Sequence, residues 1–97
     1  AIGAMRAIRR NGLRVPGDVS LVGFDDVAFA EYAEPALTTL RQETAEMGRW
    51  AVATLTEGIA ARRGGRHETG LSEARPENRV VPVHLEVRDS TAPPRPA

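Results

Sequence analysis

Two adjacent carboxylates, Asp25 and Asp26, directly follow the apolar run Val19–Phe24. In open α/β sheets, ligands bind beyond the carboxyl ends of the strands, and a carboxylate placed there can accept hydrogen bonds from two neighbouring hydroxyl groups. That chemistry suits the recognition of a sugar. The residues alone leave a second interpretation of Asp25 equally open, a carboxylate that caps the turn after the strand, which is the role we predict for Asp26.

The remaining polar residues form no pattern for catalysis or metal binding. His67 falls in a polar stretch and His84 on the polar side of a predicted strand, and neither has a second ligand at metal spacing. Asp25 and Asp26 would point apart in an extended backbone, so their adjacency does not make them an acid–base pair. The sequence has no phosphate-binding glycine loop, no nucleophile motif and no Cys. We therefore predict no enzyme, no metal and no cofactor.

Charge and composition exclude further classes. Thirteen basic residues, all of them Arg, balance thirteen acidic residues in a chain of 97, so this chain lacks the positive field that nucleic acid binding demands. No apolar run approaches the about 20 residues of a membrane span. The chain starts at Ala1 inside a predicted helix, without Met, and we read it as a piece of a longer protein. The lack of Cys is compatible with the cytoplasm, which is our predicted location.

The elements that must position these side chains begin with a helix over residues 1–11, where apolar residues recur every three positions. Gly12 is placed for a left-handed C-cap of that helix. The run Val19–Phe24 has the length and composition of a buried strand. Helix, tight turn and strand make half of a β-α-β unit, so the sequence predicts an incomplete α/β fold.

The second half of the chain predicts one long helix between short strands. Residues 25–35 have no periodicity, and Leu37–Leu40 is apolar and β-branched enough for a strand. A helix is predicted over Thr44–Arg62, with Thr44 as its N-cap. Its apolar residues recur at helical spacing.

Polar and Pro-rich stretches interrupt the C-terminal region. Residues 63–78 are polar and aperiodic, which predicts a mobile surface loop. Val80–Val81 and Val83–Val87 are predicted as strands separated by Pro82, which cannot donate to a sheet. The Pro-rich tail over 92–97 is predicted to be disordered.

Four phrases resemble motifs of the LacI/GalR family, the lactose-repressor type of transcription regulator. Val15–Asp26 reads VPGDVSLVGFDD, and Pro35–Gln42 reads PALTTLRQ at the spacing usual in that family. Met47–Gly48 and Val87–Thr91 follow in the same order, the latter reading VRDST. The resemblance covers nearly the whole chain, and its specificity lies in the ordered series of phrases.

The resemblance implies a fold. It is a partial periplasmic-binding-protein-like α/β core of type I, in which a mainly parallel sheet lies between two layers of helices (a three-layer αβα arrangement). The family's polypeptide crosses between two lobes near Thr38–Gln42, so we expect the long helix in one lobe and the first and last strands in the other. Residues 1–91 would then be the C-terminal portion of an effector-binding and dimerisation core, and the stretch 63–78 is longer than the connection usual there.

The resemblance also implies site residues. Asp25 occupies the position at which similar repressors contact the effector, and Gln42 matches a position that reaches the cleft in some members. The alternative for Gln42 is an ordinary residue before a helix. Phe29 is predicted at the effector and Tyr32 at a dimer interface, with local packing as the alternative for both. Thr44 stands where some members stack an aromatic ring on the sugar, which Thr cannot do.

The function that the resemblance implies is effector sensing in a DNA-binding transcription regulator. The core binds a sugar or similar small metabolite and controls operator binding allosterically, and the parent protein is a homodimer that reads DNA through a separate N-terminal domain. The alternative is a solute-binding protein of a sugar transport system, which shares the fold. A stand-alone interaction module is a third possibility, disfavoured by the incomplete β-α-β arrangement.

Overall fold

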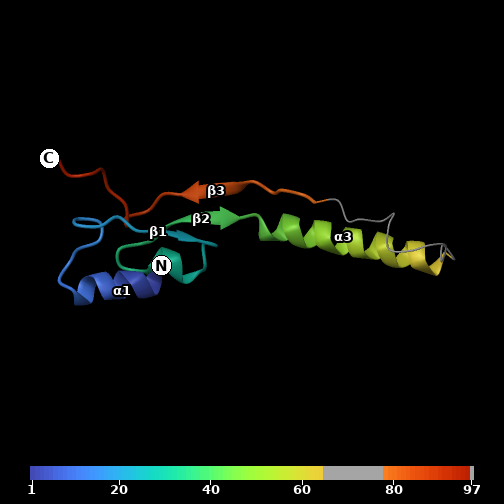
Figure 1. Cartoon of the computed structure of the whole chain (residues 1–97), viewed down its shortest axis with the longest axis horizontal. Coiled ribbons are helices and arrows are strands. Elements are labelled where there is room, and N and C mark those ends of the chain that lie inside the picture. Colours follow the sequence, from blue (N-terminus) through green and yellow to red (C-terminus); the bar gives the residue numbers. More distant parts are fainter. Residues whose placement is uncertain (65–77, 97) are drawn as a thin grey trace. The chain divides into compact units, whose positions relative to one another are not determined.

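The computed structural model describes residues 1–64 and 78–96, and it divides the chain into two compact units. Unit 1 comprises Ala1–Gln42 and Val83–Ala97, and unit 2 comprises Glu43–Pro82. The first boundary follows Gln42, at the end of the segment where the chain was expected to cross between lobes. Figure 1 shows the helices and strands of the two units in sequence colours.

Helix α1 covers Ile2–Arg10 and ends as the sequence predicts. Gly12 has a φ of 76°, and its N–H donates to the carbonyl of Arg9 at 2.9 Å. The N–H of Leu13 donates to the carbonyl of Ile8 at 3.2 Å. These two bonds form a Schellman motif, which satisfies carbonyls that the helix end leaves without partners.

Strand β1 covers only Val22–Phe24, three residues fewer than predicted. The residues before it pair with the C-terminal segment instead, because Leu21 N–H donates to the carbonyl of Ser90 at 2.9 Å. Ser20 Oγ likewise accepts a hydrogen bond from the N–H of Ala92 at 3.0 Å. The apolar run is therefore split between a sheet strand and an irregular contact with a distant part of the chain.

The predicted irregular segment 25–35 contains a short helix, α2, over Phe29–Tyr32. One turn of helix gives too few residues for a periodic pattern in the sequence. Its Ala30 is fully buried, and the carbonyl of Ala30 accepts a bond from the N–H of Leu37 at 2.8 Å. Burial of this small residue in one cluster with Met5 and Leu37, rather than helix propensity, accounts for α2.

The sheet has three strands in the order β1-β2-β3 (Figure 1). Strand β2 covers Thr38–Gln42 and runs parallel to β1, with Gly23 opposite Thr39. Strand β3 covers Val83–Glu86 and pairs with β2 in the antiparallel sense, with Leu85 opposite Leu40. The described sheet is thus mixed, with one parallel and one antiparallel pairing.

A small core lies in unit 1. Met5, Ala30 and Leu37 form its buried cluster, and Ile2, Val15 and Leu21 pack against it. The start of β2 and the last segment of the chain meet beside this cluster through buried polar side chains: Ser90, fully buried, accepts a bond from Thr38 N–H at 2.8 Å and donates to the carbonyl of Leu21 at 2.6 Å. These bonds join segments that are far apart in sequence.

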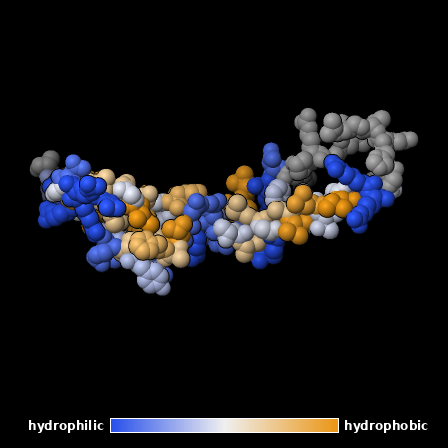
Figure 2. All heavy atoms as spheres, turned by 90° about the horizontal axis from the view of Figure 1, so that it is seen from below, coloured by the Kyte–Doolittle hydropathy of each residue, from blue (hydrophilic) through white to orange (hydrophobic). Residues whose placement is uncertain are grey.

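Unit 2 is dominated by α3, which covers Thr44–Arg63. The predicted N-cap is wrong by one residue: the cap position is Glu43, no cap side chain bonds the helix, and Thr44 is the first helical residue. None of the residues of α3 is buried. Figure 2 shows hydrophobic surface along α3, interrupted by polar side chains. In the described part of the chain, no helix is long and apolar enough to cross a membrane.

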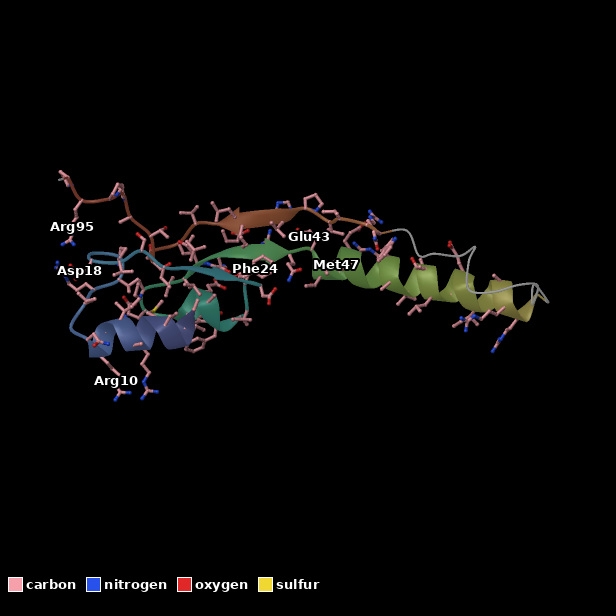
Figure 3. The ribbon with its side chains drawn as sticks, viewed as in Figure 1. Arg10, Asp18, Phe24, Glu43, Met47 and Arg95 are labelled. Atoms are coloured by element: carbon pink, nitrogen blue, oxygen red, sulfur yellow. The ribbon has the colours of Figure 1, made fainter. Side chains whose placement is uncertain are left out.

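The C-terminal predictions have mixed outcomes. Val80–Val81 is not a strand, and the strand predicted over Val83–Val87 ends at Glu86. The predicted loop 63–78 falls mostly outside the described residues, and Arg63 at its start belongs to α3. In the tail, Arg95 lies 3.2 Å from Asp18, and Figure 3 shows the two side chains next to each other. Disorder of the tail stays a prediction.

Candidate functional site

The loop after β1 places the two carboxylates on left-handed backbone, with φ of 83° at Asp25 and 45° at Asp26. Residues with a Cβ rarely adopt this conformation, although Asp tolerates it better than most. Two bonds to the neighbouring strand β2 hold the loop: Asp25 N–H donates to the carbonyl of Leu40 at 2.8 Å, and Asp26 N–H to Thr39 Oγ1 at 3.3 Å. The turn directs the two adjacent side chains to different partners.

Asp25 and Gln42, the two residues predicted to bind an effector from the ends of their strands, are in contact. The Gln42 side-chain amide donates a hydrogen bond to Oδ1 of Asp25. Asp25 is exposed and Gln42 is half-buried. Because a carboxylate offers about four lone-pair sites and an amide both donors and an acceptor, the pair can bind further hydroxyl groups while it stays intact.

The sequence predicted that Asp26 caps the turn. In the structure Asp26 instead forms an ion pair with Arg88. The Arg88 guanidinium lies 2.8 Å from Asp26 Oδ1, and the two side chains are 20 % and 13 % exposed. The hydrogen bond that Arg88 donates to Asp26, and the negative charge of Asp26, raise the pKa of Arg88 above its usual value. The pair links the loop after β1 to the segment after β3.

Arg88 and Ser90 are the residues that sequence reasoning missed. Both belong to the phrase VRDST, which entered only as part of a resemblance. A carboxylate that is largely shielded from water requires a cationic partner. The apolar residues around Asp26 in the sequence were therefore the one available indication that it has such a partner. Nothing in spacing alone identifies that partner 62 residues away.

The other predicted side chains lie outside the Asp25–Gln42 pair. Phe29 and Tyr32 are on α2 with 58 % and 77 % of their surfaces exposed, and no hydrogen bond of the described residues joins them to the pair. His84 lies in β3, whereas His67 lies outside the described residues. Among residues 1–64 and 78–96, no group of three or more His, Asp or Glu side chains is placed to hold a metal ion.

An apolar hollow lies over one face of β1 and β2, but it is distinct from the polar pair. Phe24 at the end of β1, labelled in Figure 3, is 56 % exposed there. The hollow is lined by Ala1, Ile2, Gly3, Val22, Gly23, Phe24, Val27, Leu37 and Leu40. It offers hydrocarbon and almost no hydrogen-bonding side chains, so it lacks the means to orient a hydroxyl-rich ligand.

Comparison with known protein families gives a match over residues 1–91 to the periplasmic binding protein-like domain. Among curated relatives, the ribose operon repressor of Haemophilus influenzae is 48 % identical over 59 residues, covering 61 % of this chain and 18 % of the relative. The regulator MalR of Streptomyces coelicolor is 44 % identical over 92 residues, covering 95 % of this chain and 24 % of the relative. The chain thus spans about a fifth to a quarter of the length of these relatives.

Solved structures agree with this match. A LacI family transcriptional regulator from Enterococcus faecalis V583 with bound ribose has a TM-score of 0.76 at 32 % identity, over 96 % of this chain and 31 % of the other. The regulator CelR in complex with cellobiose has a TM-score of 0.67 at 39 % identity, over 92 % and 24 %. The lac repressor dimer bound to operator has 0.67 at 35 %, over 94 % and 28 %. The similarity to LacI-family regulators that the phrases predicted is confirmed.

Proposed function

The chain belongs to the family of periplasmic binding protein-like domains, and from this premise we propose that it is part of the effector-sensing core of a LacI-type transcription regulator. The whole protein binds a sugar or a similar polyhydroxy metabolite and changes its affinity for operator DNA in response. Residues 1–91 supply the C-terminal portion of the core, and 92–97 form a tail.

One observation carries the proposal: an exposed carboxylate and an amide meet where β1 and β2 end. The Gln42 amide donates to Asp25, and Asp25 N–H is bonded to Leu40 in the neighbouring strand. A carboxylate fixed by an amide presents several acceptors and a donor within a few ångströms, which suits adjacent hydroxyl groups of one ring. Relatives support this choice of ligand, since structures of two of them contain ribose and cellobiose.

Allosteric control requires that the ligand bind two arrangements of the protein with different affinity. Unit 1 and unit 2 are connected by the chain at the end of β2 and at the start of β3. A ligand held by Asp25 and Gln42 sits at the first of these connections. We propose that ligand binding there biases the arrangement of the lobes and so the spacing of two DNA-reading domains, which lie outside this chain.

Three further features belong to the same proposal. The protein carries out no catalysis, works in the cytoplasm, and forms a homodimer like the lac repressor to which it is similar. Tyr32 contacts the second subunit, and Phe29 contacts the effector. Because Phe29 and Tyr32 stand three residues apart on α2, they share a face, and only separate substitutions distinguish their roles. The transport alternative has no support, since the relatives and structures described above are transcription regulators.

The test is a binding experiment with the full-length protein. Its DNA target is first selected from a random duplex library, and D-ribose, cellobiose and other sugars are then titrated by calorimetry and in a DNA-release assay. We expect at least one sugar to bind and to change the affinity for the selected DNA. Sugar binding with no DNA selected would contradict the regulator, and DNA binding that no sugar alters would contradict the proposed ligand class.

A further inference from the structure

The backbone at Asp25 and Asp26 is held in a conformation that neither residue favours. Both have positive φ, 83° and 45°, and they are adjacent. Such residues persist only where the surroundings determine their conformation. The side chain of Asp25 contacts Gln42, whereas that of Asp26 contacts Arg88, 62 residues further along the chain. The two adjacent side chains are thus held by different parts of the chain.

Arg88 joins Asp26 to the beginning of β2. One guanidinium nitrogen of Arg88 donates to Asp26 Oδ1 at 2.8 Å and to the carbonyl of Leu37 at 2.9 Å. The N–H of Arg88 donates to Thr38 Oγ1 at 2.9 Å. Arg88 is itself fixed, because the next residue bonds its N–H to the carbonyl of Ala36 at 3.0 Å. The Asp26 carboxylate therefore has an anchored cationic partner rather than a mobile surface side chain.

Burial makes this pair different from the surface ion pairs of the same sheet. Asp26 and Arg88 are 13 % and 20 % exposed, whereas Glu86 and Arg41, which pair at 3.1 Å across β2 and β3, are 33 % and 50 % exposed. Removing one partner of a shielded pair leaves a charge without compensation, and the remaining carboxylate turns towards water. Asp26 shares a peptide group with Asp25, and both residues have positive φ, so what holds Asp26 bears on the conformation of the whole turn.

We propose that Arg88 is a positioning residue for the ligand site: by holding Asp26 inward it keeps Asp25 directed at Gln42. Arg88 does not touch the ligand in this account. The proposal rests on the proposed function in treating Asp25 and Gln42 as the ligand site, but its structural part, control of the loop conformation by Arg88, is independent of ligand.

The experiment compares hydrogen exchange in full-length protein carrying Arg88→Gln, Arg88→Lys or the matched control Arg41→Gln. Peptides that contain the amides of Asp25 and Asp26 are followed by mass spectrometry, beside peptides from α1. In Arg88→Gln we expect exchange at Asp25 and Asp26 to rise about tenfold, which corresponds to ~1.4 kcal/mol, while exchange in α1 stays unchanged. Arg88→Lys, which retains the charge, should show a smaller rise, and Arg41→Gln should match the wild type.

Two results would overturn the positioning role. One is wild-type exchange at Asp25 and Asp26 in Arg88→Gln, and the other is an equal rise in α1, which would indicate general destabilisation. If Arg88→Gln does not fold, Asp26→Asn replaces it, because it removes the charge and keeps the shape, and the same two results apply. Calorimetry with D-ribose, cellobiose and the other sugars of the binding test separates the two proposals: raised exchange in a protein that binds none of them retains the role of Arg88 and removes the proposed ligand.

Discussion

The interactions within unit 1 differ from those within unit 2. In unit 1, hydrogen bonds join segments far apart in sequence: Thr38 N–H to Ser90, and Ser20 to Ala92, each over 50 residues or more. In unit 2, the described side-chain bonds of α3 are local, as from Thr56 to the carbonyl of Val52, or reach Arg79 just before β3. Unit 1 has a buried core, whereas α3 buries none of its residues.

The difference indicates where a precise site can be built. Asp25 and Gln42 lie in unit 1, where long-range bonds fix the ends of β1 and β2. In α3 the predicted apolar stripe is present but lies on the surface of the described chain, with Val52, Leu55 and Ile59 exposed by 64, 66 and 53 %. An amphipathic helix derives most of its stability from packing of that stripe. Unit 1 therefore holds polar side chains in fixed positions, while α3 exposes an apolar stripe on its surface.

The largest expected effect is on the core of unit 1. Leu37 is 3 % exposed and belongs to the buried cluster with Met5 and Ala30. Leu37→Ala should lower the free energy of unfolding by about 2–5 kcal/mol, because the lost side chain leaves a cavity. Urea denaturation of the chain, followed by circular dichroism, measures it. Leu55→Ala in α3 is the control, and an equally large loss there would contradict the contrast between the units.

A second comparison uses one glycine from each unit. A Cβ on Gly23 in β1 would lie 2.9 Å from Leu37 Cδ2 and 3.4 Å from Thr39 Oγ1, whereas one on Gly48 in α3 would meet nothing within 4 Å. Gly23→Ala should destabilise the chain by about 1–3 kcal/mol through overpacking. Gly48→Ala should instead raise helicity and stabilise α3 by about 0.5–1 kcal/mol. Thermal melts and the dichroism at 222 nm measure both, and effects of the same sign would contradict the account.

The smallest expected effect is electrostatic and lies in α3. The hydrogen bond from Arg49, followed by the charge of Arg79, lowers the pKa of Glu46 below its usual 4.5. Because the folded pKa is lowered, the stabilisation is present above pH 4.5 and is lost as the pH falls through the folded value. Arg49→Gln should return the pKa of Glu46 towards 4.5 in a titration of carboxyl resonances. Arg41→Gln, in unit 1, should leave it unchanged.

Local patterns in the sequence predicted the elements whose causes are local. The Schellman end of α1 follows from Gly12. Helix α3 follows from its periodic apolar residues: it begins at Thr44 as predicted and ends one residue later than predicted. The shortened β1 and the helix α2 were not predicted. Their causes are contacts with distant residues, the pairing of Leu21 with Ser90 and the burial of Ala30, which no pattern within a short window contains.

The candidate site divides in the same way. Asp25 follows from its place after a strand, and Gln42 from the resemblance, and the structure brings the two into contact. The partner of Asp26 could not be derived, because Arg88 is one of thirteen Arg residues and is brought near only by the antiparallel return of β3. The sheet topology, not the spacing of residues in the sequence, makes Arg88 the partner of Asp26.

We propose that Asp25 holds the effector. Calorimetry on the full-length protein and its Asp25→Ala variant tests this, with the sugar that the wild type binds and with the DNA-binding assay run on the same proteins. Losing hydrogen bonds to a charged group costs about 1.5–3 kcal/mol each, so two lost bonds should weaken sugar binding by roughly two orders of magnitude or more. Binding to the selected DNA should be retained, without release by sugar. A variant that binds the sugar as tightly as the wild type and leaves the DNA at the same concentration would contradict the account.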